Sequence, residues 1–171
     1  MKFNLRLSKR IAASVFGFAL LFSMFSSAHA GGEPYGAPIT LEQAKVAMAK
    51  AEETAKKNNW NVIIAIVDPG GHLIMMQRLD SGQHGSIPIA IEKAEAAVAF
   101  RRPTAFWQEL IAKGGKNLRI LNLTGGDAGV LEGGVPIVID GKVVGGIGVS
   151  GVASSNDAII AQSGVDAIAK K

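Results

Sequence analysis

The clearest hydrophobic pattern in the chain is a pair of apolar runs on either side of Asp68-Pro69-Gly70-Gly71. The first run, Val62–Val67, contains no polar residue and consists mostly of β-branched side chains, which favour an extended strand. Because proline presets φ and glycine accepts positive φ, the residues between the runs predict a tight turn, and the two runs predict a β-hairpin that ends near Asp80. A strand without a polar face is expected to be covered on both sides.

A second hairpin is predicted by Val135–Ile139 and Val143–Val149, which flank Asp140-Gly141. Asp-Gly is a preferred pair for the two-residue type I′ turn that joins antiparallel strands. The return strand contains three glycines, at positions 145, 146 and 148. Glycine weakens a strand, so this cluster indicates that a helix or a ligand approaches the backbone closely, and backbone packing is the preferred interpretation.

Apolar residues at helical spacing predict four helices around these hairpins. The first begins at Leu41, where Thr40 and Gln43 match the capping box that satisfies backbone N–H groups at a helix N-terminus. The second starts near Ile87, and the last starts near Ser154.

The third predicted helix follows Thr104, which is expected to cap it, and it ends at Gly114-Gly115. A short strand is expected near Ile120–Leu123. The resulting order is helix, hairpin, two helices, hairpin, helix. Adjacent hairpins favour an antiparallel sheet with helices packed on it, which is an α+β domain.

The N-terminal segment does not belong to this domain. Four basic residues precede an apolar run, Ile11–Phe22, and a small-residue region ends at Ala28-His29-Ala30. This order is typical of a secretory signal peptide, predicted over residues 1–30, and the apolar run is too short for a membrane span. The alternative is an uncleaved anchor. We therefore expect an exported protein, periplasmic or secreted, with a flexible lead-in over 31–38 and one domain over 39–171.

Removing the predicted signal peptide changes the charge balance. The whole chain has 18 basic and 14 acidic residues and a formal net charge of +4, and the four basic residues of the N-terminal segment account for all of it. The remaining part is close to neutral, so composition gives no support for nucleic-acid binding. The chain has no cysteine, which excludes disulfides, thiolate catalysis and zinc–thiolate sites.

Few side chains after Ala30 could bind a ligand or a metal. Only two histidines remain: His72, which follows the first predicted turn, and His84, which lies in a polar loop before a helix. The loop position favours His84, because loops on a rigid scaffold often carry function. Near the other end of that helix, Lys93, Arg101 and Arg102 could form either a solvated basic face or a clamp for an anion such as a carboxylate.

Several short motifs occur along the chain in an order that resembles the GlcG/HbpS family of haem-binding and haem-degrading-type domains, which is related to the C-terminal domain of PduO. The motifs are Asn58-Asn59-Trp60, Ile66–Leu73, Arg78–Asp80, Glu92-Lys93-Ala94, Gly133–Pro136 with Asp140-Gly141, Gly148–Gly151 and Asp157. Together they cover nearly all of Ile39–Lys171. Each motif is weak alone, and the resemblance rests on their order and spacing.

The resemblance implies a profilin-like fold, in which helices cover both faces of an antiparallel sheet, and it implies a homo-oligomer. It also implies a haem or related tetrapyrrole ligand. Some relatives use a histidine of the first helix as an iron ligand, but Leu41–Lys57 contains none. By this resemblance Lys93, Arg101 and Arg102, with Thr104, would form the propionate side of a haem site. The axial ligand would be His84, with His72 as second choice.

The sequence therefore favours an exported haem-binding protein that acts in haem or iron scavenging or in sensing. Two alternatives stay open. One is an enzyme that degrades haem or acts on another small ligand. The other is an oligomeric partner module without a ligand.

Overall fold

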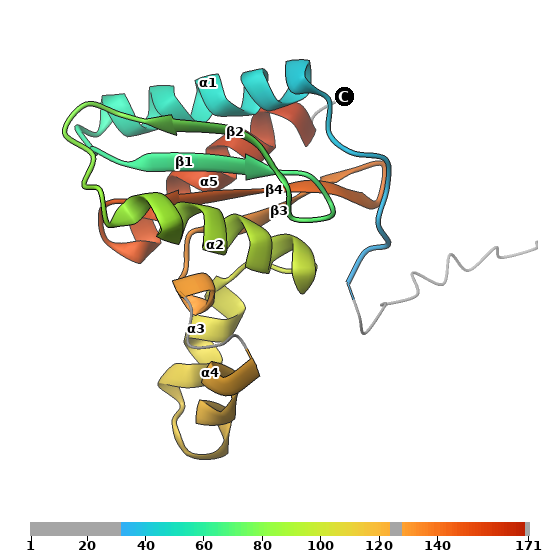
Figure 1. Cartoon of the computed structure of the whole chain (residues 1–171), viewed down its shortest axis with the longest axis vertical. Coiled ribbons are helices and arrows are strands. Elements are labelled where there is room, and N and C mark those ends of the chain that lie inside the picture. The colour runs from blue at the N-terminus through green and yellow to red at the C-terminus, as the bar shows by residue number, and fades with distance from the viewer. Residues whose placement is uncertain (1–31, 124–127, 170–171) are drawn as a thin grey trace, which may run out of the picture.

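A four-stranded antiparallel sheet organises the fold in the computed structural model (Figure 1). The structure describes residues 32–123 and 128–169, so the predicted signal peptide lies outside the described residues. The strand order is β2-β1-β4-β3. Both predicted hairpins are present, and they lie side by side because β1 pairs with β4. The strand bounds are β1 Ile63–Val67, β2 Leu73–Arg78, β3 Gly134–Ile139 and β4 Lys142–Ser150.

Helices cover both faces of this sheet, which confirms the α+β prediction. Helices α1 and α5 pack against each other and cover one face, while α2 lies along the other (Figure 1). The capping box of Thr40 and Gln43 is formed as predicted at the start of α1. The helical bounds are α1 Leu41–Lys57, α2 Ser86–Ala99, α3 Ala105–Ala112, η1 Gly115–Arg119, α4 Ile120–Leu123, η2 Ala128–Val130 and α5 Ser154–Ala169.

Strand β1 is buried along its whole length, as its lack of a polar face predicted. Ile64 and Ile66 belong to the large core under α1 and α5. Ile63 and Ala65 alternate with them and pack under α2 with Ala90. This alternation is the period of two that a pleated strand imposes on its side chains.

The glycines of β4 allow α2 to lie very close to the sheet. A Cβ atom built on Gly148 would lie 2.0 Å from the carbonyl oxygen of Ala90 and 2.5 Å from the backbone nitrogen of Ala94. A Cβ on Gly146 would lie 2.7 Å from the carbonyl oxygen of Ala94. The preferred interpretation of the glycine cluster, backbone packing, is therefore confirmed, and the element that approaches is a helix.

Two local predictions differ from the structure. Ile120–Leu123 forms the one-turn helix α4 and no strand, because a run of four residues has too little periodicity to separate the two states.

The lead-in is hydrogen-bonded to the sheet: the N–H of Gly36 donates to Val143 O at 2.9 Å, and the N–H of Val143 donates to Pro34 O at 2.8 Å. Strand β4 begins several residues before its pairing with β1, so its first residues offer an open edge there.

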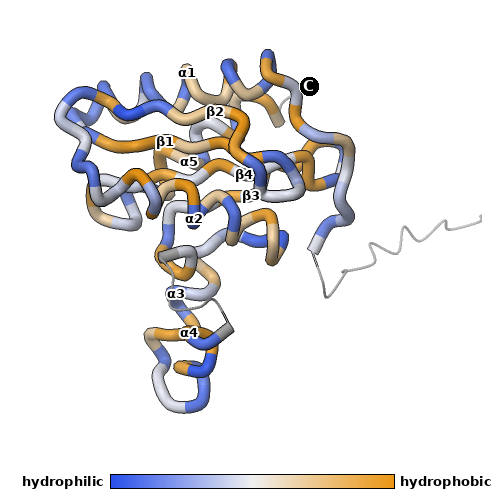
Figure 2. Tube along the Cα trace, in the orientation of Figure 1, coloured by the Kyte–Doolittle hydropathy of each residue, from blue (hydrophilic) through white to orange (hydrophobic). Residues whose placement is uncertain are grey.

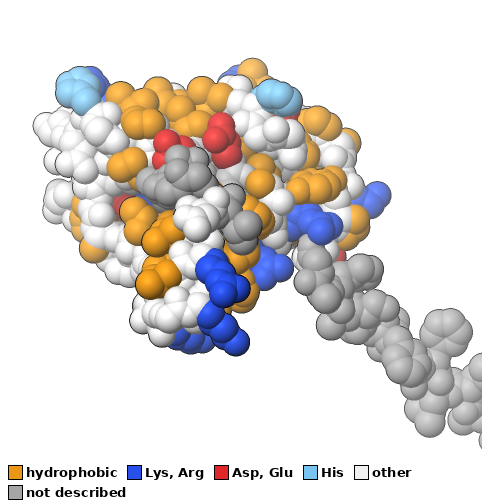
Figure 3. Space-filling model, turned by 60° about the horizontal axis from the view of Figure 1, so that its bottom comes forward, with side chains coloured by type: hydrophobic (Ala, Val, Ile, Leu, Met, Phe, Trp, Pro, Cys, Tyr) orange, Lys and Arg blue, Asp and Glu red, His pale blue; other side chains and the backbone are white. Residues whose placement is uncertain are grey.

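Residues 105–123 project from the sheet as a helical arm made of α3, η1 and α4 (Figures 1 and 2). No residue of α3 or η1 is buried, although the arm carries large apolar side chains. Phe106, Leu118 and Leu121 are exposed. Figure 3, in which this side of the molecule comes forward, shows Lys and Arg side chains next to apolar ones on the projection.

Candidate functional site

His72 forms a hydrogen-bonded pair with Asp68 at the tip of the first hairpin. The Asp68 carboxylate accepts hydrogen bonds from the backbone N–H of Gly70 at 2.7 Å and of His72 at 3.0 Å. Its two oxygens also lie 3.2 Å from Nδ1 of the His72 ring. The side chain of His72 is 83% exposed, so its Nε2 edge faces solvent. The turn sequence carries a signal for this pairing, because Asp at the start of a turn accepts from the backbone two residues on.

These hydrogen bonds fix the charge of Asp68 and the tautomer of His72. The backbone N–H of His72 is the main cause that holds the pKa of Asp68 below its usual value, and the His72 ring and the N–H of Gly70 add to it. Asp68 is therefore an acceptor at neutral pH, and neutral His72 places its proton on Nδ1. The Nε2 lone pair is then free. Metal-bound histidines usually show this arrangement, in which the other ring nitrogen donates to a carboxylate.

His84 contacts a cationic side chain, whereas His72 contacts a carboxylate. Its Nδ1 lies 2.8 Å from a guanidinium nitrogen of Arg78. Arginine can only donate, so Nδ1 must accept, and neutral His84 then carries its proton on Nε2. To offer a lone pair at Nε2, His84 would have to give up its bond to Arg78. The ring chemistry thus reverses the order of preference that was inferred from the sequence for the two histidines.

The candidate residues lie at opposite ends of α2. His84 precedes this helix and Arg101 follows it, so at 1.5 Å per residue they are about 25 Å apart along its axis. His72 lies nearer to the arginine end. A Cβ atom built on its neighbour Gly71 would lie 3.8 Å from Cγ of Glu95, which is on the second half of α2. The structure therefore separates His84 from the arginines.

The two arginines point to different elements. Arg101 lies 5.3 Å from the ring centre of Tyr35, and one of its N–H groups donates to Glu33 O at 3.3 Å. Arg102 lies 4.5 Å from the ring centre of Phe106 and contacts Trp107 at the base of the helical arm. Arg101 also has a positive φ of 52°, because it follows the C-cap of α2 in the left-handed position of a Schellman motif.

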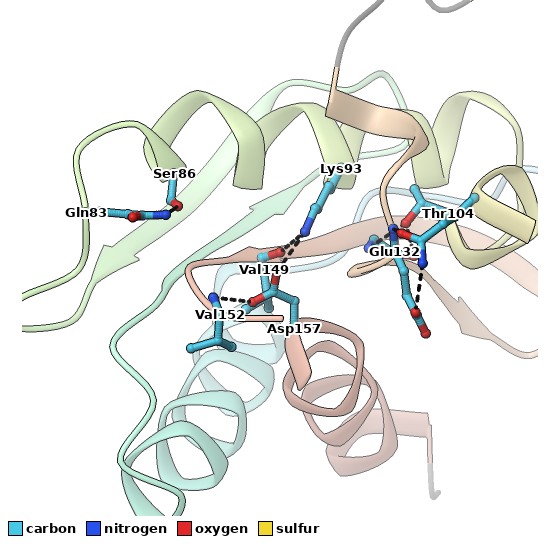
Figure 4. A network of polar contacts seen from close by, with 10 residues as sticks. Gln83, Ser86, Lys93, Thr104, Glu132, Val149, Val152 and Asp157 are labelled. Carbon is cyan, nitrogen blue, oxygen red and sulfur yellow. Dashed lines mark hydrogen bonds and ion pairs between the residues drawn. The ribbon is translucent and has the colours of Figure 1, made fainter. Parts of the chain in front are cut away.

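Lys93 is buried, which removes it from the surface clamp inferred from the sequence (Figure 4). It is 2% exposed, and Nζ donates to Oδ2 of Asp157 and to the carbonyl oxygen of Val149, both at 2.9 Å. The other carboxylate oxygen of Asp157 accepts from the N–H of Val152 at 3.2 Å. Helix α2 and helix α5 pack on opposite faces of the sheet, so this ion pair joins the two helical layers past the end of β4.

Asp157 is the residue that sequence reasoning left without a chemical role. Burial raises the pKa of this carboxyl, and the ammonium of Lys93 opposes the rise. Gly133 lies against the pair: a Cβ atom there would lie 2.8 Å from Nζ of Lys93 and 2.9 Å from Cβ of Asp157. Four of the family-like motifs, those containing Lys93, Gly133, Val149 and Asp157, thus meet at one closed polar cluster.

Thr104 joins the base of the helical arm to the sheet and does not cap α3 with its side chain. It is fully buried, its N–H donates to Gly134 O at 2.9 Å, and its Oγ1 accepts from the N–H of Gly134 at 2.9 Å. Figure 4 shows Thr104 next to Glu132. Both hydrogen-bonding groups are used inside the fold, so Thr104 offers no free donor to a ligand.

We expect Thr104→Val to destabilise the protein by about 1–3 kcal/mol, because the buried N–H of Gly134 would lose its acceptor. Urea unfolding measures the change. Thr104→Ser keeps the hydroxyl and is the matched control, with a smaller loss. Equal stability of Thr104→Val and the parent would mean that the hydroxyl is not needed at this joint.

Other classes of site find no support in the described residues. Within 32–123 and 128–169, no group of three or more His, Asp or Glu side chains is placed to hold a metal ion. None of the helices in these ranges is long and apolar enough to cross a membrane.

Comparison with known proteins places this fold and these motifs in one family. Protein GlcG of Escherichia coli strain K12 is 38% identical over 112 residues, which are 66% of this chain and 81% of GlcG. The solved structure of a PduOC:haem complex has a TM-score of 0.71 and 26% identity, and covers 77% of this chain and 95% of that chain. The structure of HbpS has a TM-score of 0.68 and 30% identity, with 82% and 96% covered.

The family model described as Haem degrading protein HbpS-like matches residues 39–166. This range contains the sheet, helices α1 and α2, the helical arm and all but the last turn of α5. The resemblance inferred from the short motifs is therefore confirmed, and the chain belongs to the HbpS-like family.

Proposed function

We propose that this protein is an exported haem-binding protein. The observation that carries the proposal is the likeness, over most of the domain, to the structure of a PduOC:haem complex. Scavenging or sensing of haem are roles that fit an exported protein that binds haem. Export itself rests on the pattern of a basic segment, an apolar run and Ala28-His29-Ala30.

Within the part of the chain that the structure describes, one histidine, His72, is prepared to bind haem iron. His72 holds its Nδ1 against the Asp68 carboxylate and exposes Nε2, the arrangement that second-shell carboxylates impose on metal-bound histidines. Leu73, which follows it, is 49% exposed and supplies apolar surface beside the ring. Arg101 lies at the same end of α2 and offers N–H donors to a propionate.

Each of these groups has a defined task. Asp68 orients the imidazole, Nε2 would donate its lone pair to the iron, and Arg101 would bind negative charge of the ligand. Bound haem would supply an iron centre whose redox potential depends on its axial ligand. Lys93 and Thr104 stabilise the fold, and His84 contacts Arg78 at the other end of α2, away from this site.

The helical arm supports an oligomeric form of this protein. Its exposed Phe106, Leu118 and Leu121 are large apolar side chains on a projecting element, and such patches usually mark a contact with another protein surface. We include in the proposal that a second copy of the chain covers the arm. Light scattering of the purified protein reports the mass directly.

The test is a titration of the purified protein with hemin, followed by the Soret band. We expect saturable binding that His72→Ala abolishes or strongly weakens, whereas Asp68→Asn weakens affinity by about tenfold because the imidazole loses its carboxylate partner. His84→Ala is the matched control and should leave the titration unchanged. If the His84 variant loses the Soret shift and the His72 variant keeps it, the ligand assignment is wrong. If the parent gives no saturable shift, the function is wrong.

Haem degradation is the second candidate, favoured by the description of the matching family. It requires that the complex consume haem with a reductant and oxygen faster than free hemin is bleached. The same loss in His72→Ala and in the parent would count against catalysis at this site.

A further inference from the structure

A second site lies at the end of the β1–β2 hairpin away from the turn that carries His72, between the C-terminal end of α1 and the end of β2. There the structure contains a cavity of about 320 Å³. Its volume falls in the range of about 300–1,000 Å³ that is typical of small-molecule sites. The side chains that matter for its chemistry are Glu52, Lys56, Asn59, Trp60, Arg78 and Asp80.

One pair of charges in the wall is already satisfied. Glu52 and Lys56 form an ion pair one turn apart on α1. The Lys56 ammonium is the main cause that lowers the pKa of Glu52, and a hydrogen bond from Gln77 adds to it. This pair therefore forms part of the wall, and a ligand would be bound by the other polar groups.

Most of the other polar side chains of the wall have no direct partner. Across the ranges that the structure describes, the side chains of Asn59, Trp60, Asn61 and Asp80 form no direct hydrogen bond or ion pair. Asp80 still lies near Lys56, because the pKa of that ammonium is raised mainly by Glu52 and also by the charge of Asp80. Arg78 contacts His84 through one terminal nitrogen, which leaves its other N–H donors available. The cavity thus presents a carboxylate that no donor contacts directly and a guanidinium with spare donors, together with amides and an indole.

These charges exclude ligands of a single sign. An anion would be attracted by Arg78 and repelled by Asp80, whereas a cation would be attracted by Asp80 and repelled by Arg78. A ligand that carries both charges close together satisfies both groups. We propose that this cavity binds a free α-amino acid as its zwitterion. The carboxylate pairs with Arg78, the ammonium pairs with Asp80, and Trp60 packs against the side chain.

The proposal is independent of haem binding and is tested by calorimetric titration of the purified protein with each of the common amino acids. We expect saturable binding of at least one. Its deaminated and decarboxylated analogues should each bind at least about tenfold more weakly, because each leaves one charge of the cavity unpaired. Asp80→Asn and Arg78→Gln should each weaken the binding of the amino acid by a similar factor. Glu53→Gln, an exposed change on α1 outside the cavity, is the control and should have no effect.

A spectroscopic readout locates the binding. The chain has two tryptophans, Trp60 and Trp107, and the ligand should shift the indole N–H resonance of Trp60 while that of Trp107 stays in place. Trp60→Phe assigns the signal. The proposal is overturned if no amino acid binds at millimolar concentrations, if the deaminated analogue binds as well as the parent, or if only Trp107 responds. Hemin binding by Asp80→Asn should match the parent, which separates this site from the haem site.

Discussion

Lys93→Met is expected to destabilise the protein by about 3–5 kcal/mol at neutral pH, because it leaves the buried Asp157 carboxylate without its cation. The reciprocal change, Asp157→Asn, leaves the Lys93 ammonium buried against a neutral amide. The double variant removes both charges and should recover much of the loss, since the cost of an unpaired buried charge disappears. Denaturant unfolding of the four proteins forms a double-mutant cycle that measures the coupling.

The loss of stability caused by Lys93→Met should depend on pH. Burial raises the pKa of Asp157, and loss of the Lys93 ammonium removes the influence that opposes this rise. A carboxyl with a folded-state pKa above its unfolded value stabilises the fold fully below the unfolded value, and this contribution is lost as pH rises through the folded pKa. The deficit should therefore be smallest in acid and grow with pH, whereas the double variant should show no such dependence. Lys57→Met, at an exposed lysine, is the control. A deficit below about 1 kcal/mol at every pH would show that the pair is not a buried charge pair.

The sheet was predictable because its signals are local. Asp68–Gly71 and Asp140-Gly141 set two tight turns, and the all-apolar β1 required a cover on both faces. In the second turn, Asp140 and Gly141 have φ values of 49° and 69°, as a type I′ turn requires. The run Ile120–Leu123 carried no such signal, and α4 formed where a strand was expected.

The candidate site was harder to predict, because it depends on which polar groups meet in space. Lys93 follows an acidic residue on a predicted helix, and this pattern predicts a cation on the surface. Its burial follows from Asp157, which is 64 residues away and is brought near by the packing of α5. The ranking of His72 and His84 likewise depends on whether the partner is a carboxylate or a guanidinium, which residue spacing alone does not reveal.

The close contact between α2 and β4 leads to the second large effect: Gly148→Ala is expected to destabilise the protein by about 1–3 kcal/mol or more. The added methyl would lie 2.0 Å from the carbonyl oxygen of Ala90, which is backbone and cannot turn aside, so α2 must move away from the sheet. Lys93 lies on the same helix, and its bonds to Asp157 would be strained by that movement. Urea unfolding and thermal melting measure the loss.

The matched control is Gly85→Ala, at the N-cap of the same helix. Gly85 has an ordinary φ of −62°, and a Cβ atom there would meet nothing within 4 Å. Both changes restrict the unfolded chain equally, so the difference between them isolates the clash in the folded state. We expect the control to stay within about 0.5 kcal/mol of the parent. If Gly148→Ala were as stable as Gly85→Ala, α2 could shift freely over β4, and the glycines of this strand would need an explanation other than the packing of α2.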